Sequence, residues 1–220
     1  MIWICYIAML IVPYLMSGIN FSIIVCKMKT GKDIRTMGSG NAGLTNTLRV
    51  LGKGAAGIVL IGDVSKAALA VLIVRLVFLF VGGVDTMNPA AEMTWVEYFA
   101  VFMAIVGHCF PIYYGFKGGK GVLAAISAIF VLDWRIACIL LGIFIVLVAA
   151  TRYVSLGSCV ASSCFCIAAP LFGYFLDHDP AFIVNTFIAA FCGGLIVFRH
   201  RANIKRLVTH TEKKLGEKAK

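Results

Sequence analysis

The stretch GSGNAGLTNTLR, residues 38–49, places hydroxyl, amide and guanidinium groups in a chain that is otherwise apolar. Its glycines permit positive φ and a close approach of the backbone to a ligand. Successive amides in such a loop can form a concavity that holds an anion. If a short helix begins near Ala42 or Leu44, its positive end would aim at the same anion. Arg49 lies one helical turn beyond Thr45 and would present a planar fork to phosphate. The stretch therefore indicates a phosphate site, with an ordinary glycine-rich connector as the alternative.

A second stretch, GHCFPIYYGFKGGKGV at 107–122, joins two lysines to three glycines in its KGGKG segment, directly before an apolar run. This arrangement has the logic of a phosphate loop without the full spacing of the nucleotide-binding P-loop. The alternative is a flexible turn whose lysines meet anionic lipid, but a simple turn needs one glycine and not three. His108 lies within the preceding apolar segment, where a packing role and a functional role are equally compatible with a histidine.

Two further stretches add polar groups. TRYVSLGS, residues 151–158, carries Ser155, and a serine near a helix start is usually a cap. FRHRANIKRL, residues 198–207, places His200 and Asn203 on one helical face at three-residue spacing, among several cations. A basic helix seated on anionic headgroups would explain the cations, but it would not explain the asparagine.

The composition defines the elements that must position these groups. Of the 220 residues 61% are hydrophobic, and the mean hydropathy is +0.96, which predicts an all-α, multi-pass membrane protein with a single domain over residues 1–220. The net charge of +10 does not indicate a nucleic-acid partner, because the cations lie in short loops between apolar runs. The eight cysteines are interpreted as buried apolar side chains. No His/Cys spacing is typical of a zinc site, and neither a metal nor another cofactor is expected.

Apolar runs predict the helices. The first run has no basic residues ahead of it, which favours a retained helix over a cleaved signal peptide. Seven runs can be drawn: residues 2–26, 54–82, 94–115, 121–132, 136–150, 158–176 and 182–198.

The number of crossings follows from the charges. If residues 121–150 formed one long helix, six crossings would put the C-terminal tail with its eight cations outside. With seven crossings, seventeen Lys and Arg lie inside and Arg135 alone lies outside, as the positive-inside rule requires. We therefore predict seven transmembrane helices, the N-terminus outside, the C-terminus in the cytosol and an active site at the cytosolic face. Residues 121–132 span only about 18 Å, so this segment must be tilted, extended by its flanks or half buried.

Three charges fall inside the second predicted helix, residues 54–82. Asp63 and Lys66 lie on one face of the second helix. A structural ion pair between them is favoured over a functional role in which the two charges lead into the site. Arg75 lies near the outer end of that helix and is expected to snorkel to the interface.

The four polar stretches all fall on the same predicted membrane face. Together they hold more anion-binding groups than one phosphate needs, which indicates a membrane-embedded transferase or carrier for phosphorylated or acyl metabolites. A carrier would also require polar residues in the outer half of the bundle and an internal repeat, and neither is found in the sequence. A structural lipid-surface protein would explain the cations but not the glycines.

GSGNAGLTNTLR, GHCFPIYYGFKGGKGV and RHRANIKRL followed by TEKK resemble, in this order, the three motifs of the bacterial acyl-phosphate:glycerol-3-phosphate acyltransferase family. The resemblance spans about residues 33–214, and TRYVSLGS is similar to the family's corresponding inner loop. It implies seven helices and transfer of an acyl group from acyl-phosphate to the sn-1 hydroxyl of glycerol-3-phosphate. The products would be lysophosphatidic acid and phosphate, in the first step of phospholipid synthesis. It further implies a bacterial plasma-membrane enzyme without a cofactor, and we expect a monomer in the bilayer.

The resemblance also assigns site residues. The residues implied in activity are Ser39, Arg49, Lys117, His200 and Asn203. Those implied in holding the acyl-phosphate are Gly40, Asn41, Gly43, Thr45, Asn46 and Ser155. Those implied in holding glycerol-3-phosphate are Arg49, Lys117, Gly118, Gly119, Lys120, His200 and Asn203. Glu212 is similar to the family's final glutamate, which is more structural than catalytic.

Some features depart from the family or remain open. Ala42 stands where the family often has proline, and His210 stands where it usually has glycine, which leaves the role of Glu212 open. Other glycerol-phosphate acyltransferases use a histidine followed four residues later by an aspartate, and no histidine here has one. The hydroxyl proton could pass to His200 or to the departing phosphate. The phosphate is preferred, because an imidazole in so cationic a segment serves better as a ligand.

Overall fold

Helices form all of the regular structure in residues 1–217, the part of the chain that the computed structural model describes. The longer helices are α1 (Ile2–Gly18), α2 (Phe21–Thr30), α3 (Leu44–Phe80), α4 (Trp95–Cys109), α5 (Val122–Leu132), α6 (Trp134–Thr151), α7 (Val154–Phe175), α8 (Phe182–Arg199) and α9 (Arg201–Val208). Short 3₁₀ turns are η1 (Ile34–Thr36), η2 (Pro89–Ala91) and η3 (Ile112–Tyr114). The expected all-helical class is confirmed.

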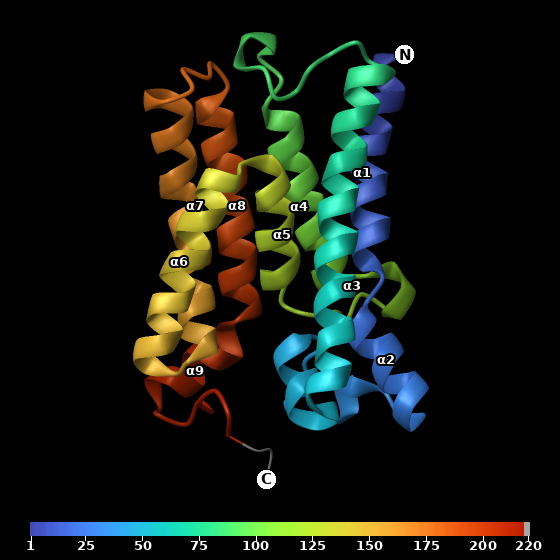
Figure 1. Cartoon of the computed structure of the whole chain (residues 1–220), viewed down its shortest axis with the longest axis vertical. Coiled ribbons are helices and arrows are strands. Elements are labelled where there is room, and N and C mark those ends of the chain that lie inside the picture. The colour runs from blue at the N-terminus through green and yellow to red at the C-terminus, as the bar shows by residue number, and fades with distance from the viewer. Residues whose placement is uncertain (218–220) are drawn as a thin grey trace.

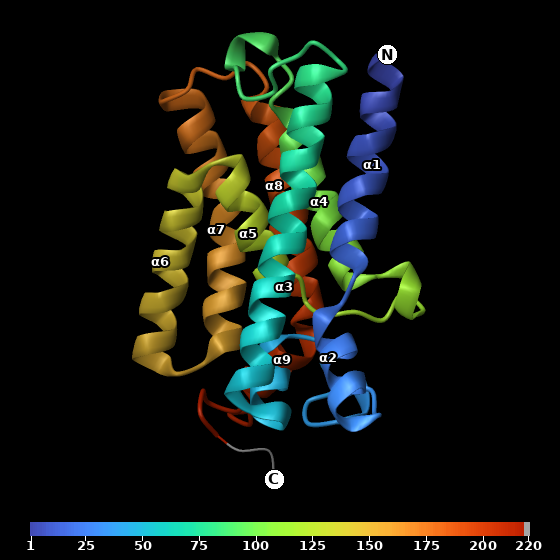
Figure 2. The same cartoon turned by 45° about the vertical axis from the view of Figure 1, so that its right-hand side comes forward.

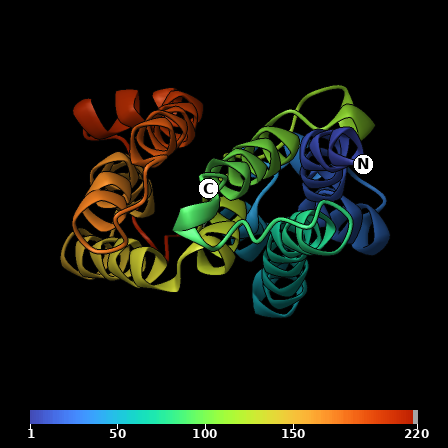
Figure 3. The ribbon, with the colours of Figure 1, turned by 90° about the horizontal axis from the view of Figure 1, so that it is seen from above.

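The long helices run alternately up and down, and the N-terminus and α9 lie at opposite ends of the bundle (Figures 1 and 2). Seen from above, α4 and α5 stand between a group made of α1, α2 and α3 and a group made of α6, α7 and α8 (Figure 3). In the described residues, six helical segments are long and apolar enough to cross a membrane, with α1 and α2 counted as one. The chain is thus an integral multi-pass protein, and its orientation stays a prediction.

The region 121–150 is two helices, as expected, and not one. Asp133 separates them and caps α6, because its carboxylate accepts from the Arg135 N–H at 2.8 Å. α5 has 11 residues, about 16 Å of helix, which is too short to cross a hydrocarbon core of about 30 Å. Its turn into α6 lies well short of the upper ends of α3 and α7 (Figure 1). α5 is instead packed against α3, α4 and α6, so the seventh segment is buried among its neighbours.

The first apolar run is broken, contrary to the expectation of one helix over 2–26. α1 ends at Gly18, and Asn20 starts α2 by accepting from the Ile23 N–H at 3.1 Å. An asparagine side chain competes for backbone donors in this way and favours a new helix start. The break leaves the carbonyl of Ile19 available to a side chain from a neighbouring helix. α3 also departs from a straight helix, because Gly52 adopts a φ of 81°.

Charged side chains in the upper half pair within the bundle. Arg75 donates to Glu97 at 2.8 Å and 2.5 Å, and Thr86 donates to the same carboxylate at 2.6 Å. The expectation that Arg75 snorkels is therefore wrong. A carboxylate from the neighbouring α4, with 2% of its side chain exposed, holds the guanidinium inside.

Candidate active site

Asn46 organises the first polar loop. Its Nδ2 donates to the carbonyls of Met37 and Asn41 at 3.0 and 3.1 Å, and its Oδ1 accepts from the Ser39 N–H at 2.8 Å. The side chain is buried and all of these bonds are internal. Asn46 was expected to hold acyl-phosphate, and its side chain instead shapes the loop that would do so.

The loop ends in a helix start with free donors. α3 begins at Leu44, one of the two helix starts considered from the sequence, and continues into the apolar segment expected from residue 54. Within residues 1–217 the N–H groups of Asn41, Ala42, Leu44 and Thr45 have no hydrogen-bond acceptor. Such donors at a positive helix end form an anion site.

The second loop uses its glycines differently from the prediction. The N–H of Gly118 donates to the carbonyl of Cys109 and that of Gly119 to the carbonyl of His108, both at 3.1 Å. A Cβ at Gly118 would overlap the carbonyl oxygen of His108, and one at Gly119 would overlap the His108 ring and the carbonyl oxygen of Ala42. These glycines therefore allow two chain segments to pack closely, and their amides are not available to an anion.

Two arginines clamp this loop. Arg199 donates to the carbonyls of Gly118 and Gly119 at 2.9 to 3.1 Å. Arg35 donates at 2.9 Å to the carbonyls of Tyr114 and Lys117. Arg199 is one of the cations of the FRHRANIKRL stretch, and its Nε and one terminal nitrogen donate to this loop.

The C-terminal segment completes the site through Glu212. Its Oε1 accepts from Asn203 Nδ2 at 2.6 Å and from Ser155 Oγ at 2.8 Å, and its Oε2 accepts from Arg206 Nε at 2.6 Å. Burial raises the pKa of this carboxyl, but the bonds from Asn203, Ser155 and Arg206 outweigh it, and the net pKa is lowered. His210 adopts the left-handed region with φ of 54°, so it preserves a turn of the kind that glycine favours and lets Glu212 reach its partners.

Lys120 and His200 carry shifted pKa values. Lys120 Nζ donates to Asn203 Oδ1 at 2.5 Å, and burial lowers the pKa of this ammonium to about 8. Burial, followed by the charge of Lys120, lowers the pKa of His200 to about 4. His200 Nδ1 lies 2.8 Å from the carbonyl of Ile196. A carbonyl only accepts, so Nδ1 carries the proton and Nε2 offers a lone pair.

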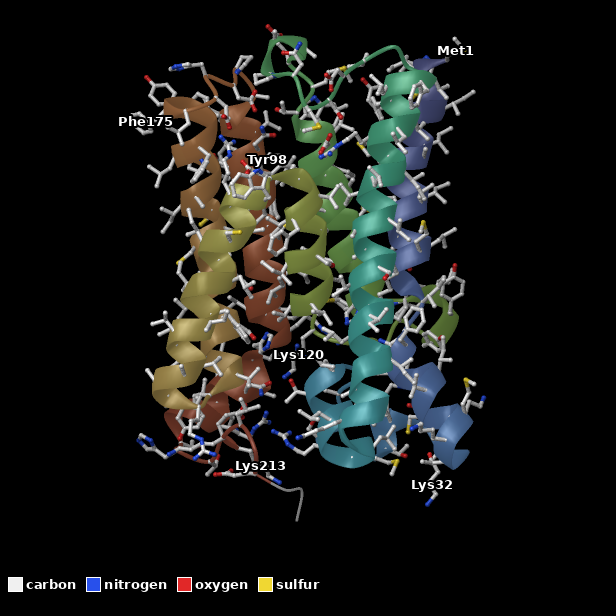
Figure 4. The ribbon with its side chains drawn as sticks, in the orientation of Figure 1. Met1, Lys32, Tyr98, Lys120, Phe175 and Lys213 are labelled. Atoms are coloured by element: carbon white, nitrogen blue, oxygen red, sulfur yellow. The ribbon has the colours of Figure 1, made fainter. Side chains whose placement is uncertain are left out.

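These groups line one cavity of about 670 Å³. Its polar part gathers side chains from the two loops, from the starts of α3 and α7 and from the C-terminal segment: Ser39, Asn41, Thr45, Arg49, Lys120, Ser155, His200, Asn203, Arg206 and Glu212. It continues between the helices as an apolar part lined by Ile105, Ile126, Ile129, Leu140, Phe144 and Phe165. Lys120 lies in the lower half of the bundle, between the start of α3 and α9 (Figure 4). The cavity therefore accepts an amphiphile with an anionic head.

Most predicted site residues meet here, and two do not. Arg49 is half-buried, lines the cavity and has no hydrogen-bond or ion-pair partner in the described chain, so its guanidinium is free for a ligand. Gly40, Gly43 and Gly118 also line the cavity. Lys117 is exposed and Gly119 is packed behind the wall, and neither lines the cavity.

Several contributors were missed from the sequence. Asn20 fixes the first loop by donating to the carbonyl of Ala42 at 3.2 Å. Arg35 joins the first loop to the second. A polar residue interrupting an apolar run was the only available signal for Asn20, and the DIR segment before the first glycine loop was the signal for Arg35.

The fold and site define a class: an integral membrane enzyme whose cavity joins an anion-binding mouth to an apolar interior. The family model described as glycerol-3-phosphate acyltransferase matches residues 7–210. A glycerol-3-phosphate acyltransferase of Clostridioides difficile (strain 630) is 42% identical over 213 residues, covering 97% of each chain. Another from Halalkalibacterium halodurans is 39% identical over 206 residues, covering 93% of each.

Solved structures agree. The crystal structure of PlsY (YgiH), an integral membrane glycerol 3-phosphate acyltransferase, in its glycerol 3-phosphate form superimposes with a TM-score of 0.77 at 35% identity, covering 94% of each chain. Its lysophosphatidic acid form gives a TM-score of 0.73 at 33% identity, again covering 94% of each chain. The chain belongs to the glycerol-3-phosphate acyltransferase family of the PlsY type, the membrane enzymes of phospholipid synthesis.

Proposed function

We propose that the protein transfers an acyl group from acyl-phosphate to the sn-1 hydroxyl of glycerol-3-phosphate, releasing lysophosphatidic acid and phosphate. The observation that carries the proposal is the single cavity that joins free anion donors to an apolar interior. The related crystal structures were solved in glycerol 3-phosphate and lysophosphatidic acid forms, which supports the acceptor and the product. The use of acyl-phosphate as the donor goes beyond these two forms and is part of this proposal.

The donor is proposed to bind with its phosphate at the start of α3 and its chain between the helices. Free N–H groups of Leu44 and Thr45 and the hydroxyl of Ser39 face an anion there, and the positive end of the helix adds to the attraction. The proposed acyl-phosphate ligands also include Gly40, Asn41, Gly43 and Ser155, with Asn46 acting through the shape of the loop. Burial of the acyl chain between the helices would contribute about 0.8 kcal/mol of binding free energy per CH₂ group.

Glycerol-3-phosphate is proposed to bind beside the acyl-phosphate, between α3 and the segment of His200 and Asn203. The free guanidinium of Arg49 and the ammonium of Lys120 would hold its phosphate. His200 Nε2 and Asn203 would orient its hydroxyls, since both side chains are buried and fixed by internal bonds. Lys117 would contribute from the rim, and the two glycines between the lysines would act by close packing.

The reaction needs no covalent enzyme intermediate, because acyl-phosphate is an activated mixed anhydride. The glycerol oxygen forms a bond to the carbonyl carbon, the bond from that carbon to the phosphate oxygen breaks, and the hydroxyl proton leaves on the phosphate. His200 is a poor base, because its pKa of about 4 leaves little affinity for a proton at neutral pH. This supports the departing phosphate as the proton acceptor and His200 as a ligand. Cations stabilise the charge that develops on the phosphate, and positioning supplies much of the remaining rate.

The membrane arrangement remains part of the proposal. Seven crossings with the N-terminus outside would put the loops, α9 and the cavity mouth on the cytosolic side of the bacterial plasma membrane. The predicted asymmetry of basic residues supports this orientation. A monomer suffices, because every proposed contact lies within one chain.

Phosphate release from palmitoyl-phosphate tests the proposal, with purified protein in lipid vesicles and glycerol-3-phosphate added. Release should depend on glycerol-3-phosphate, and Arg49→Ala and Asn203→Ala should each lower kcat/KM at least 100-fold. Arg201→Ala is the matched control, because this exposed guanidinium lies over the Phe198 ring and outside the cavity. Wild-type protein that releases no phosphate above background would contradict the proposal.

A further inference from the structure

His108 lies in the last turn of α4 and lines the same cavity, but it has no role in the mechanism proposed above. The residue is only 4% exposed. A buried polar ring held at a reaction cavity, on the helix that leads into the KGGKG loop, is a candidate for direct contact with the substrate.

The buried charge beside it fixes the position of the ring proton. Lys66 Nζ lies 2.8 Å from Asp63 Oδ1 and 2.6 Å from the carbonyl oxygen of Ile19. It also lies 3.1 Å from His108 Nδ1. An ammonium group only donates, and the hydrogen bonds of Lys66 go to the Ile19 carbonyl and to His108 Nδ1, while Asp63 is its ion-pair partner. His108 Nδ1 must therefore accept, so the ring proton is on Nε2.

Nε2–H is left without an acceptor inside the protein. Nε2 packs against Gly119, where an added Cβ would overlap it, and among residues 1–217 it has no hydrogen-bond partner. The break between α1 and α2 is part of this arrangement, because it frees the Ile19 carbonyl that Lys66 uses. The ion pair of Lys66 and Asp63 and the break between α1 and α2 together fix the His108 ring with its proton on Nε2.

His108 lies at the boundary between the two parts of the cavity. Ile105, about one turn along α4, lines the apolar part, and Lys120 lines the polar part. With the phosphate of a bound acyl-phosphate in the polar part and its chain in the apolar part, the carbonyl joining them falls at this boundary.

We propose that His108 Nε2–H donates a hydrogen bond to the carbonyl oxygen of the acyl group, and to the oxyanion that forms as the glycerol oxygen adds. This inference rests on the proposed acyl transfer. His108 keeps its proton throughout, and the hydroxyl proton still leaves on the phosphate. A fixed, neutral imidazole donor stabilises charge that exists only in the transition state, so it acts mainly on kcat.

The test compares His108→Phe, which keeps a ring without the donor, with His108→Gln, which keeps an N–H of similar reach. Loss of one oxyanion donor costs about 10²–10³ in kcat. His108→Phe is therefore expected to lower kcat at least about 100-fold, with both KM values within about threefold of wild type. His108→Gln should recover at least about tenfold of that loss. His178→Gln is the control for histidine replacement, because His178 is exposed at the opposite end of the molecule.

The outcomes separate this inference from the proposed function. Failure of the wild-type protein to turn over palmitoyl-phosphate would contradict the proposed function itself. Active wild type with a His108→Phe variant within threefold of its kcat, or with only the KM for glycerol-3-phosphate raised, would overturn the role of His108. If His108→Phe does not fold, ¹⁵N NMR of histidine-labelled wild type decides: a proton on Nε2 of His108 supports the proposal, and a proton on Nδ1 overturns it.

Discussion

The ammonium group of Lys120 should lose its proton within an accessible pH range. Burial lowers its pKa to about 8, whereas an exposed lysine titrates near 10.4. The charged form holds the phosphate of glycerol-3-phosphate in the proposed site. Raising the pH through 8 therefore removes an attractive charge from the free enzyme, and affinity for the acceptor should fall.

The size of the effect follows from the titration. With a pKa of about 8, about 90% of Lys120 is charged at pH 7 and about 10% at pH 9. The substrate phosphate is about 90% dianionic at pH 7 and more so at pH 9, since its second pKa is near 6, so its own titration changes the binding little. Because kcat/KM reports the free enzyme, its value for glycerol-3-phosphate should fall about tenfold between pH 7 and pH 9.

The measurement is kcat/KM for glycerol-3-phosphate against pH in lipid vesicles, at saturating acyl-phosphate and with spontaneous hydrolysis subtracted. Lys120→Arg is the matched variant, because an arginine stays charged throughout, and its profile should be flat between pH 7 and pH 9. A flat wild-type profile, or the same fall in Lys120→Arg, would refute the role assigned to this charge.

Three further predictions follow from single contacts. Glu212→Gln removes the anion that holds Asn203, Ser155 and Arg206. It should raise the KM for glycerol-3-phosphate about tenfold or more, since a hydrogen bond to a charged group is worth about 1.5–3 kcal/mol. An unchanged KM would count against the positioning role of Glu212. Arg75→Leu leaves a buried carboxylate unpaired and should lower the free energy of unfolding by about 3–5 kcal/mol, measured by thermal unfolding in detergent, whereas Arg75→Leu with Glu97→Leu should recover most of it. Gly118→Ala should cost activity at least tenfold because a Cβ there overlaps the His108 carbonyl oxygen and Pro111, while Gly57→Ala, with open space around it, should leave kcat unchanged.

Much of the fold could be predicted from the sequence because bilayer burial imposes long apolar runs and segregates basic residues. The separation of α5 from α6 was predicted because the distribution of basic residues favours seven crossings over six. In the structure Asp133 ends α5 and caps α6. The break before Asn20 was not predicted, because one asparagine within an apolar run leaves hydropathy high. Arg75 was assigned wrongly for a related reason: its partner Glu97 comes from another helix.

The site could be predicted as a set of residues more readily than as a set of contacts. His200 and Asn203 were expected on one face, and both are buried at the cavity. Residue type alone does not reveal which donors are already occupied. Asn46 and Arg199 have side chains suited to an anion, but both donate to backbone carbonyls, and those acceptors are defined only by the packing of distant segments.

The most direct measurement is the identity of the acyl donor. Purified protein in vesicles would receive glycerol-3-phosphate with palmitoyl-phosphate or, separately, palmitoyl-coenzyme A, and lysophosphatidic acid and phosphate would be quantified together. We expect one phosphate released for each 1-acyl product formed from palmitoyl-phosphate, and no product from the thioester. Product formed from the thioester at an equal or higher rate, or phosphate released without acylated glycerol-3-phosphate, would contradict the reaction proposed for this cavity.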